Sequence, residues 1–489
     1  MLFSSIVFLF YFFPTVLVLY YALSFSRKLQ NVLLLLASLV FYAWGEPVNV
    51  LLMIFSIVFN SAMGYLVQYC GGRVKKGFLV LTVACNLGIL FVFKYLGFVL
   101  DNLGITQGAL GAFRPALPIG ISFFTFQALS YVVDVYRGTV KAENPFYVGL
   151  YISFFPQLIA GPIIQYNTVA DQIRSRRTSF ELLSLGLCRF TVGLGKKVLL
   201  SNCFAAIADN VFGWSAIGVE RYPVPVTLAW LGSLAYSLQI YYDFSAYSDM
   251  AIGLGLCFGF RFGENFNYPY ISCCISDFWR RWHISLTSWF TEYLYFPLGG
   301  SRKGMFRRYV NIMIVFLVSG LWHGAAWSFV LWGALHGVYQ VVGHLTREGR
   351  NRLYDRLGIH RESGAFRAGQ RLVTFALVSF AWIFFRAEGL RQALVYCRNM
   401  LSGFAPWTLF DGTLASFGIS GLDWAILLAA LGLLGLISAL REKGYDSGCI
   451  LKQGMAARAL VCWALFMSIV IFGAYGGEYS ASAFIYAGF

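Results

Sequence analysis

The chain has 489 residues, of which 58% are hydrophobic and only 12% carry a charged side chain. A soluble protein has about 25% charged residues, so this composition excludes an ordinary soluble enzyme. The formal net charge is +15, which in a soluble protein would suggest a nucleic-acid partner. Here the basic residues fall in short loops between apolar segments, so they mark the cytoplasmic side of a membrane and we expect no nucleic-acid ligand.

The first part of the chain predicts membrane-spanning helices separated by short polar turns. The N-terminal stretch 1–24 has neither a basic leader nor a small-residue cleavage site, so we expect a retained helix whose N-terminus lies outside. Apolar segments at 30–44, up to about residue 70, and at 77–100 follow, and a fifth ends at Arg137. Stretches of about 20 apolar residues can cross a bilayer, and the basic residues between them agree with alternating sides.

The centre of the chain is less regular. Pro156 and Pro162 should break the segment that contains them, and a broken helix is tolerated at membrane depth only inside protein or along a cavity. The next segment, 182–209, carries three basic residues, so we expect it to be partly inserted or to lie at the interface. A long apolar run from 226 to 260 follows.

Basic loops dominate the last part of the chain. The loops at 299–308, 347–371 and 441–458 should face the cytoplasm, so the last helix, 459–475, should run outward and leave the C-terminus outside. We expect one membrane domain over 1–489 with roughly 11 or more transmembrane helices. Its parts would be N-terminal helices at 1–225, a motif-rich core at 226–345, and C-terminal helices at 346–489.

The cysteines give no sign of a metal centre or a disulfide framework. The ten cysteines are scattered, mostly in apolar segments, and no Cys or Cys/His group has the spacing of a zinc site. We therefore expect free thiols and no metal ligands.

Ionisable residues inside apolar segments are costly and mark either a site or a satisfied structural group. The structural alternative is a hydrogen bond between helices, or a side chain that reaches the interface. Asp243 and Asp249 are six residues apart and therefore not on one helical face, so we interpret them as structural contacts. The residues of this kind are Lys94, Asp134, Asp243, Asp249, His283, His323 and His336.

His323 lies in the segment SGLWHGAAW, inside a long run without any charged residue. Gly320 and Gly324 flank it and would allow another backbone to approach closely. Trp322 and Trp327 should wall the ring in. Burial favours the neutral imidazole, which is the form that a general base needs. From this pattern alone, catalysis and core packing both remain open.

His283 lies in the basic, aromatic segment DFWRRWHISLTSWF. Ser276 could cap a helix whose first turn holds Asp277. Arg280 and Arg281 stand side by side just ahead of a basic loop, so they suit an anionic, nucleotide-like ligand such as coenzyme A. Anchoring to anionic lipid headgroups explains the same residues equally well.

Several long motifs occur in a fixed order in the second half of the chain. Together they resemble the membrane-bound O-acyltransferase family, and within it the alginate O-acetyltransferase type. The opening MLFSSIVFLFYFFP and two later N-terminal segments fit the same group, so the resemblance covers most of the chain and is densest over 239–340. The motifs are IYYDFSAYSDMAIGLGLCFGF, ENFNYPYIS, DFWRRWHISLTSWF, YLYFPLGGSRKG and SGLWHGAAWSFVLWGALHG.

The resemblance implies an all-α polytopic membrane protein in which a ring of helices, some broken or re-entrant, surrounds a thin central region. The buried histidine of the family matches His323. A second polar position matches His283, which would position the thioester or stabilise the oxyanion. Members of this type sit in the bacterial cytoplasmic (inner) membrane and move an acetyl group outward from cytoplasmic acetyl-CoA, without a metal. An SGNH-type partner then acetylates a polysaccharide.

The end of the chain, FIYAGF at 484–489, resembles a tail that is associated with acyl relay in this group. The resemblance implies that Tyr486 takes part in acyl relay, and we expect it to accept the acyl group beside His323. From their charge, we expect Arg280 and Arg281 to hold the phosphates of the donor. A tail that only packs on the outer surface is the structural alternative. Two other functions stay open, D-alanyl transfer to teichoic acid and polysaccharide or ion transport, although the repeated halves of many transporters are missing.

Overall fold

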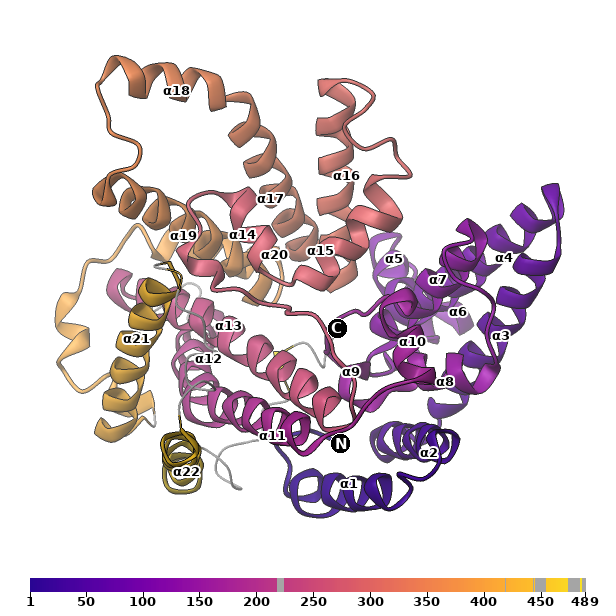
Figure 1. Cartoon of the computed structure of the whole chain (residues 1–489). Helices are drawn as coiled ribbons and strands as arrows, with labels where there is room; N and C mark the ends of the chain where they lie inside the picture. Colours follow the sequence, from indigo (N-terminus) through magenta and orange to yellow (C-terminus); the bar gives the residue numbers. More distant parts are fainter. Residues whose placement is uncertain (218–223, 418, 443, 445–453, 474–483, 486–489) are drawn as a thin grey trace. The chain divides into compact units, whose positions relative to one another are not determined.

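The computed structural model describes the chain except residues 218–223, 418, 443, 445–453, 474–483 and 486–489. Within the described ranges the chain is helical and has no strand (Figure 1). The chain forms two compact units. The first unit comprises Met1–Gly193, Tyr247–Glu264 and Ala483–Phe489, and the second comprises Leu194–Ala246 and Asn265–Ser482. The all-α prediction is therefore confirmed.

Seven described helices are long and apolar enough to cross a membrane. Two shorter apolar helices, Val7–Ala22 and Ala459–Phe472, accompany them. The composition and these helices define a multi-pass membrane protein, while the total of roughly 11 spans stays a prediction. The seven helices are Arg27–Gly45, Val50–Tyr69, Gly72–Asn102, Phe180–Trp214, Met305–His323, Gly364–Arg386 and Gly421–Leu440.

In the first unit, α3, α4 and α7 pack against one another (Figure 1). Gly64 of α3 allows this approach, because a Cβ atom there would lie 2.8 Å from the Tyr131 hydroxyl oxygen of α7. The predicted break at Pro156 is confirmed, since α8 ends at Ser153 and α9 starts at Phe155. The elements are η1 (Val7–Phe12), α1 (Phe13–Ala22), α2 (Arg27–Gly45), α3 (Val50–Tyr69), α4 (Gly72–Leu90), η2 (Phe91–Tyr95), α5 (Leu96–Asn102), α6 (Gly108–Ala112), α7 (Ile121–Arg137), α8 (Pro145–Ser153), α9 (Phe155–Leu158), α10 (Tyr166–Arg174) and α11 (Phe180–Gly195).

In the second unit, α16 and α17 form a tight antiparallel hairpin, and α19 packs on α17 (Figure 1). Two short helices, α14 and α15, precede the hairpin, and α13 runs on into the first unit. The elements are η3 (Lys196–Ser201), α12 (Asn202–Ile217), α13 (Val226–Cys257), η4 (Pro269–Ile271), α14 (Ile275–Arg281), α15 (Ile284–Phe290), η5 (Thr291–Tyr295), α16 (Met305–His323), α17 (Trp327–Leu345), α18 (Arg347–Arg356), α19 (Gly364–Arg386), α20 (Leu390–Asn399), η6 (Pro406–Leu409), η7 (Ala415–Phe417), α21 (Gly421–Glu442) and α22 (Met455–Phe472).

Two basic residues of the helical stretch 180–214, the buried Lys197 and the partly exposed Arg189, pair with acids far along the chain. Lys197 forms a 2.6 Å ion pair with Asp243 in the second unit. Arg189 forms ion pairs with Asp249 and Glu264 in the first unit. The two aspartates thus serve separate structural contacts, as expected. The stretch is long and apolar enough to cross a membrane. The partly inserted or interfacial helix that its basic residues suggested stays a prediction.

In the part of the chain that the structure describes, four π-helical turns interrupt or extend the α-helices: η1, η2, η3 and η5. A π-turn adds one residue to a helical turn and often occurs where a polar side chain must be placed. Lys94 lies in η2 and donates a hydrogen bond of 3.0 Å to the Ser122 hydroxyl of α7. This contact supports the structural interpretation of Lys94.

Candidate active site

His323 is the last residue of α16 and its side chain is almost completely buried, at 1% exposure. Three aromatic rings surround the imidazole edge to face. The ring centroids of Trp322, Trp332 and Phe385 lie 4.8, 5.0 and 5.1 Å from that of His323. The expectation that Trp327 walls the ring in is wrong, because Trp327 is 56% exposed and Trp332, one and a half turns further along α17, takes that place.

Glycines bring the two helices of the hairpin together at His323. A Cβ atom at Gly320 would lie 3.3 Å from the Gly333 Cα and even closer to the Phe329 carbonyl oxygen. Any larger side chain would push α17 away from α16. The predicted close approach at Gly320 is therefore confirmed, and it fixes where the turn presents His323.

His283 links α14 to α15 and is fully buried, at 0% exposure. Its backbone has the left-handed angles φ 44° and ψ 55°, which are uncommon for a residue with a side chain and often mark functional positions. The ring packs edge to face on Phe244, with 4.6 Å between centroids, and lies 6.2 Å from the Trp322 ring. Because Trp322 also contacts His323, the indole of Trp322 neighbours both predicted histidines.

Asn265 holds the segment that contains His283. Its backbone oxygen accepts a hydrogen bond of 3.0 Å from the Ile284 amide. Its side-chain oxygen accepts from the Ser285 amide and hydroxyl, at 3.2 and 2.9 Å, and lies 3.2 Å from Nδ1 of His283. Complete burial lowers the pKa of the His283 imidazole to about 3, so the ring is neutral at pH 7. Sequence reasoning missed Asn265, although it lies in the quoted motif ENFNYPYIS.

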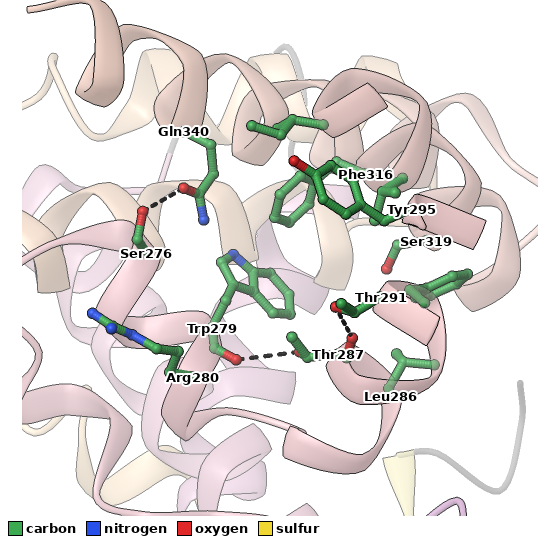
Figure 2. A pocket seen from close by; sticks show the side chains of 13 residues that line it. Ser276, Trp279, Arg280, Leu286, Thr287, Thr291, Tyr295, Phe316, Ser319 and Gln340 are labelled. Carbon is green, nitrogen blue, oxygen red and sulfur yellow. Dashed lines mark hydrogen bonds between the residues drawn. The ribbon is translucent and has the colours of Figure 1, made fainter. Parts of the chain in front are cut away.

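A pocket of about 240 Å³ lies among α14, α15, η5, α16 and α17 (Figure 2). Its walls are mainly apolar and aromatic, with hydroxyl groups from Thr287, Thr291 and Ser319. Neither histidine lines this pocket, but Ser319 lies one helical turn before His323 on α16. The lining residues are Ser276, Trp279, Arg280, Leu286, Thr287, Phe290, Thr291, Tyr295, Ile312, Val315, Phe316, Ser319 and Gln340.

The two neighbouring arginines have different surroundings. Arg280 lines the pocket and its side chain is 72% exposed, 3.7 Å from Asp277. Arg281 is not among the residues that line the pocket. Its Nε lies 3.1 Å from the Asp277 carboxylate, and its guanidinium donates to the Asn267 carbonyl oxygen. The helix places Asp277 in its first turn as expected. Arg280 is therefore the arginine better placed to meet an anionic ligand.

Ser276 does not cap α14 as predicted. The N-cap residue is Cys274, and α14 starts at Ile275, two residues earlier than the capping pattern suggested. The Ser276 hydroxyl instead donates to the Gln340 side chain of α17 at 2.5 Å (Figure 2). This hydrogen bond fastens α14 to α17 at the edge of the pocket.

His336 supports the pocket from behind. Its ring is fully buried, and its Nδ1 accepts a hydrogen bond of 3.3 Å from the indole nitrogen of Trp279. Trp279 in turn forms the wall of the pocket (Figure 2). The structural interpretation of His336 is therefore favoured.

The C-terminal tail is described only at its beginning. Tyr486 lies outside the described residues. Phe484 is buried, at 2% exposure, and packs edge to face on Tyr247 of the first unit, with 5.0 Å between ring centroids. The start of the FIYAGF motif therefore packs inside this unit.

No metal-binding group is found in the described ranges, where His, Cys, Asp and Glu side chains do not gather in threes. The cysteines in the same ranges are free thiols.

The apolar helices define a multi-pass membrane protein whose interior holds two buried histidines, His283 and His323. Residues 121–353, which include both histidines and the pocket, match the membrane-bound O-acyltransferase family. The chain is 42% identical over 439 residues to the probable alginate O-acetylase AlgI of Pseudomonas aeruginosa, covering 88% of this chain and 80% of that protein. The chain therefore belongs to the membrane-bound O-acyltransferase family and is an O-acyltransferase.

Two further relatives bear on the substrate. The chain is 36% identical to the peptidoglycan O-acetyltransferase of Helicobacter pylori, over 82% of this chain and 80% of that protein. It is 28% identical to the teichoic acid D-alanyltransferase of Bacillus subtilis, over 45% of this chain and 57% of that protein. Similarity to the two acetyl-transferring relatives thus extends over more of the chain.

Proposed function

We propose that the protein takes an acetyl group from cytoplasmic acetyl-CoA and passes it through the membrane for O-acetylation of an extracytoplasmic polysaccharide. The observation that carries this proposal is the pocket. Its lining includes the exposed Arg280 and also Ser319. Ser319 lies one helical turn before the buried His323 on α16. The names of the alginate and peptidoglycan relatives support acetyl transfer to a glycan.

The donor would enter from the cytoplasm. Its phosphate groups would meet Arg280, with Arg281 nearby, because guanidinium groups form strong charge-assisted hydrogen bonds to phosphate. Its thioester arm would lie along the apolar pocket, where side chains exclude the water that would otherwise hydrolyse it. His323 lies one helical turn, about 5.4 Å, beyond Ser319 along α16. The arm must extend past Ser319 by about this distance for the thioester to reach His323.

The chemistry would be acyl transfer to a hydroxyl group, and the acceptor that we propose is Tyr486. His323 acts as general base and removes the phenolic proton while the oxygen attacks the thioester carbon. The carbon–sulfur bond breaks, and the proton passes to the departing thiolate. A phenol has a pKa of about 10, so it needs this assistance, which typically contributes about 10²- to 10⁴-fold. We assign His283 to the same centre because it shares the Trp322 indole.

The acetylated tyrosine would then meet an SGNH-type partner outside the cell membrane. This arrangement requires an inner-membrane protein with both termini outside. The burial of Phe484 supports a tail that enters the protein. D-alanyl transfer is the second candidate, and the shorter match to the D-alanyltransferase supports it less well. The chain belongs to an acyltransferase family, so we no longer consider polysaccharide or ion transport as its function.

The test uses purified protein in lipid nanodiscs with radiolabelled acetyl-CoA. We expect covalent label on the chain, lost in Tyr486→Phe and retained in Tyr69→Phe, whose exposed ring is far from the tail in sequence. Label on Tyr486→Phe at the wild-type level would exclude the tyrosine relay. Label from a D-alanyl-loaded carrier protein, but none from acetyl-CoA, would favour D-alanyl transfer.

A further inference from the structure

The side-chain amide of Asn265 has a defined orientation. One of its two terminal atoms faces the Ser285 backbone amide at 3.2 Å. A backbone N–H can only donate, so the atom that it faces must be the carbonyl oxygen Oδ1 and not the NH₂ group. The Ser285 hydroxyl, 2.9 Å away, donates to the same oxygen.

This orientation determines the tautomer of His283. Nδ1 of the ring lies 3.2 Å from the same Oδ1. A carbonyl oxygen can only accept, so Nδ1 must carry the proton that it shares with Oδ1. A neutral imidazole has one N–H, and Nε2 therefore carries the lone pair.

Three features leave the ring little freedom to depart from this arrangement. The backbone of residues 283–285 is tied to Asn265 by the Ile284 and Ser285 amides. The left-handed backbone at His283 sets the direction of its side chain. Phe244 packs edge to face on the ring and restricts its tilt. Hydrogen bonding to Asn265 then selects which edge of the imidazole faces inward.

We propose that Asn265 is a positioning residue that keeps His283 protonated on Nδ1, so that Nε2 acts as a hydrogen-bond acceptor toward the acyl donor. Stabilising an oxyanion requires a donor, which Nε2 is not in this tautomer. Of the two roles that the sequence left open for His283, positioning the donor is the one that fits. Nε2 can accept a hydrogen bond from an amide N–H of the donor's pantetheine arm, whereas the thioester group itself has no hydrogen to donate. This inference rests on the proposed function only where it places His283 at the reacting centre.

The decisive measurement is the ¹⁵N NMR spectrum of protein labelled on its histidine rings and held in lipid bilayers. The His283 signals are identified by their loss in His283→Gln. We expect a protonated Nδ1 and an unprotonated Nε2 in the wild-type protein. A protonated Nε2 on His283 in the wild-type protein would overturn the proposal.

Two variants at Asn265 test its part in the arrangement. Asn265→Asp keeps an acceptor oxygen and should keep the tautomer and most of the activity. Asn265→Ala should give a mixture of tautomers and lower kcat about 10-fold or more among the folded molecules. Unchanged tautomer and kcat in Asn265→Ala would overturn the positioning role. The protein could give the expected ¹⁵N spectrum for His283 and still fail to use acetyl-CoA. That result would support the proposed tautomer and count against acetyl-CoA as the donor.

Discussion

His323 shows how a single side chain is prepared by its surroundings. Three aromatic rings enclose the imidazole and exclude bulk water from it, which favours the neutral ring that a general base needs. We expect His323→Ala to lower acyl transfer by about 10²- to 10⁴-fold, the usual contribution of a general base. Acetylation would be measured in cells and on purified protein, normalised to folded chain.

The control for this substitution is His360→Ala, since His360 is exposed on the loop after α18. It should leave acetylation unchanged. Wild-type acetylation in His323→Ala would contradict the assignment of the base. If His323→Ala does not fold, the more conservative His323→Gln separates loss of catalysis from loss of folding, because glutamine keeps a polar side chain of similar size.

Arg280 should act on donor binding alone. Because the side chain is largely exposed, its electrostatic contribution is screened, and we expect Arg280→Ala to raise KM for acetyl-CoA about fivefold, or about 1 kcal/mol, with kcat little changed. Titration of initial rates against donor concentration measures this. Arg302→Ala, in the nearby exposed loop, is the matched control. An equal fall of kcat in Arg280→Ala would argue against a role limited to phosphate binding.

At this scale the sequence predicted the two histidines and the arginine that lines the pocket. It missed Asn265 and Gln340, because their importance comes from hydrogen bonds to residues 18 to 64 positions away. It also chose Trp327 instead of Trp332 as the neighbour of His323. The helical phase restarts after the break at 324–326, so spacing counted through the break gives the wrong face.

Between elements, the ion pair of Lys197 and Asp243 fastens η3 to α13 inside the second unit. Removing one partner leaves a buried charge without compensation, which typically costs about 3–5 kcal/mol. We therefore expect Asp243→Ala to lower the thermal unfolding temperature strongly. The double variant Lys197→Met, Asp243→Leu should recover most of the loss, because two apolar groups replace the pair. Equal instability of the single and double variants would show that the pair itself is not what matters.

The crossing of α16 and α17 depends on Gly320. A Cβ atom there meets the backbone of α17, which cannot move locally, so Gly320→Ala should cost about 1–3 kcal/mol and reduce acyl transfer by displacing His323. Thermal unfolding and label transfer from acetyl-CoA are measured together. Gly343→Ala, where a Cβ atom meets only open space, is the matched control and should be neutral or slightly stabilising. A Gly320→Ala protein with native stability and activity would contradict this packing.

Elements were predictable where a local signal defines them. The break at Pro156 follows from proline chemistry, and the glycines at the hairpin follow from their size. In the helix at 180–214, Arg189 and Lys197 looked unpaired in the sequence. Their acidic partners lie 46 to 75 residues further along the chain, and sequence spacing does not reveal such pairs.

For the whole molecule, the distribution of basic residues predicts which loops face the cytoplasm. In a variant without native cysteines, Ser301→Cys in the basic loop before α16 should react with a membrane-impermeant thiol reagent only after the cells are opened. Ser402→Cys, in the loop after α20, should react in intact cells, because that loop is predicted to be outside. Both positions are exposed in the structure. The reverse labelling pattern would contradict the proposed direction of acyl transfer.

Composition and the length of the apolar segments were sufficient for the multi-pass character, and the family resemblance implied the all-α fold. The number of membrane spans could not be predicted in this way, because several apolar segments form short or broken helices such as α8 and α9. The division into two compact units was not visible in the sequence either. It depends on contacts between distant segments, and α13 contributes to both units without any change in its composition.

The π-turns have a consequence for how sequences of this family should be compared. Each residue of an α-helix advances the chain by about 100° around the axis, so one added residue turns everything downstream of it to a new face. Ser201, the last residue of η3, donates a hydrogen bond of 3.0 Å to the Asp243 carboxylate. A homologue that is one residue shorter at η3 would direct the counterpart of Ser201 away from that carboxylate while its helix stayed intact. Single-residue gaps within these helices are therefore best interpreted as rotations, and substitutions beyond a gap should be matched by direction in space and not by column.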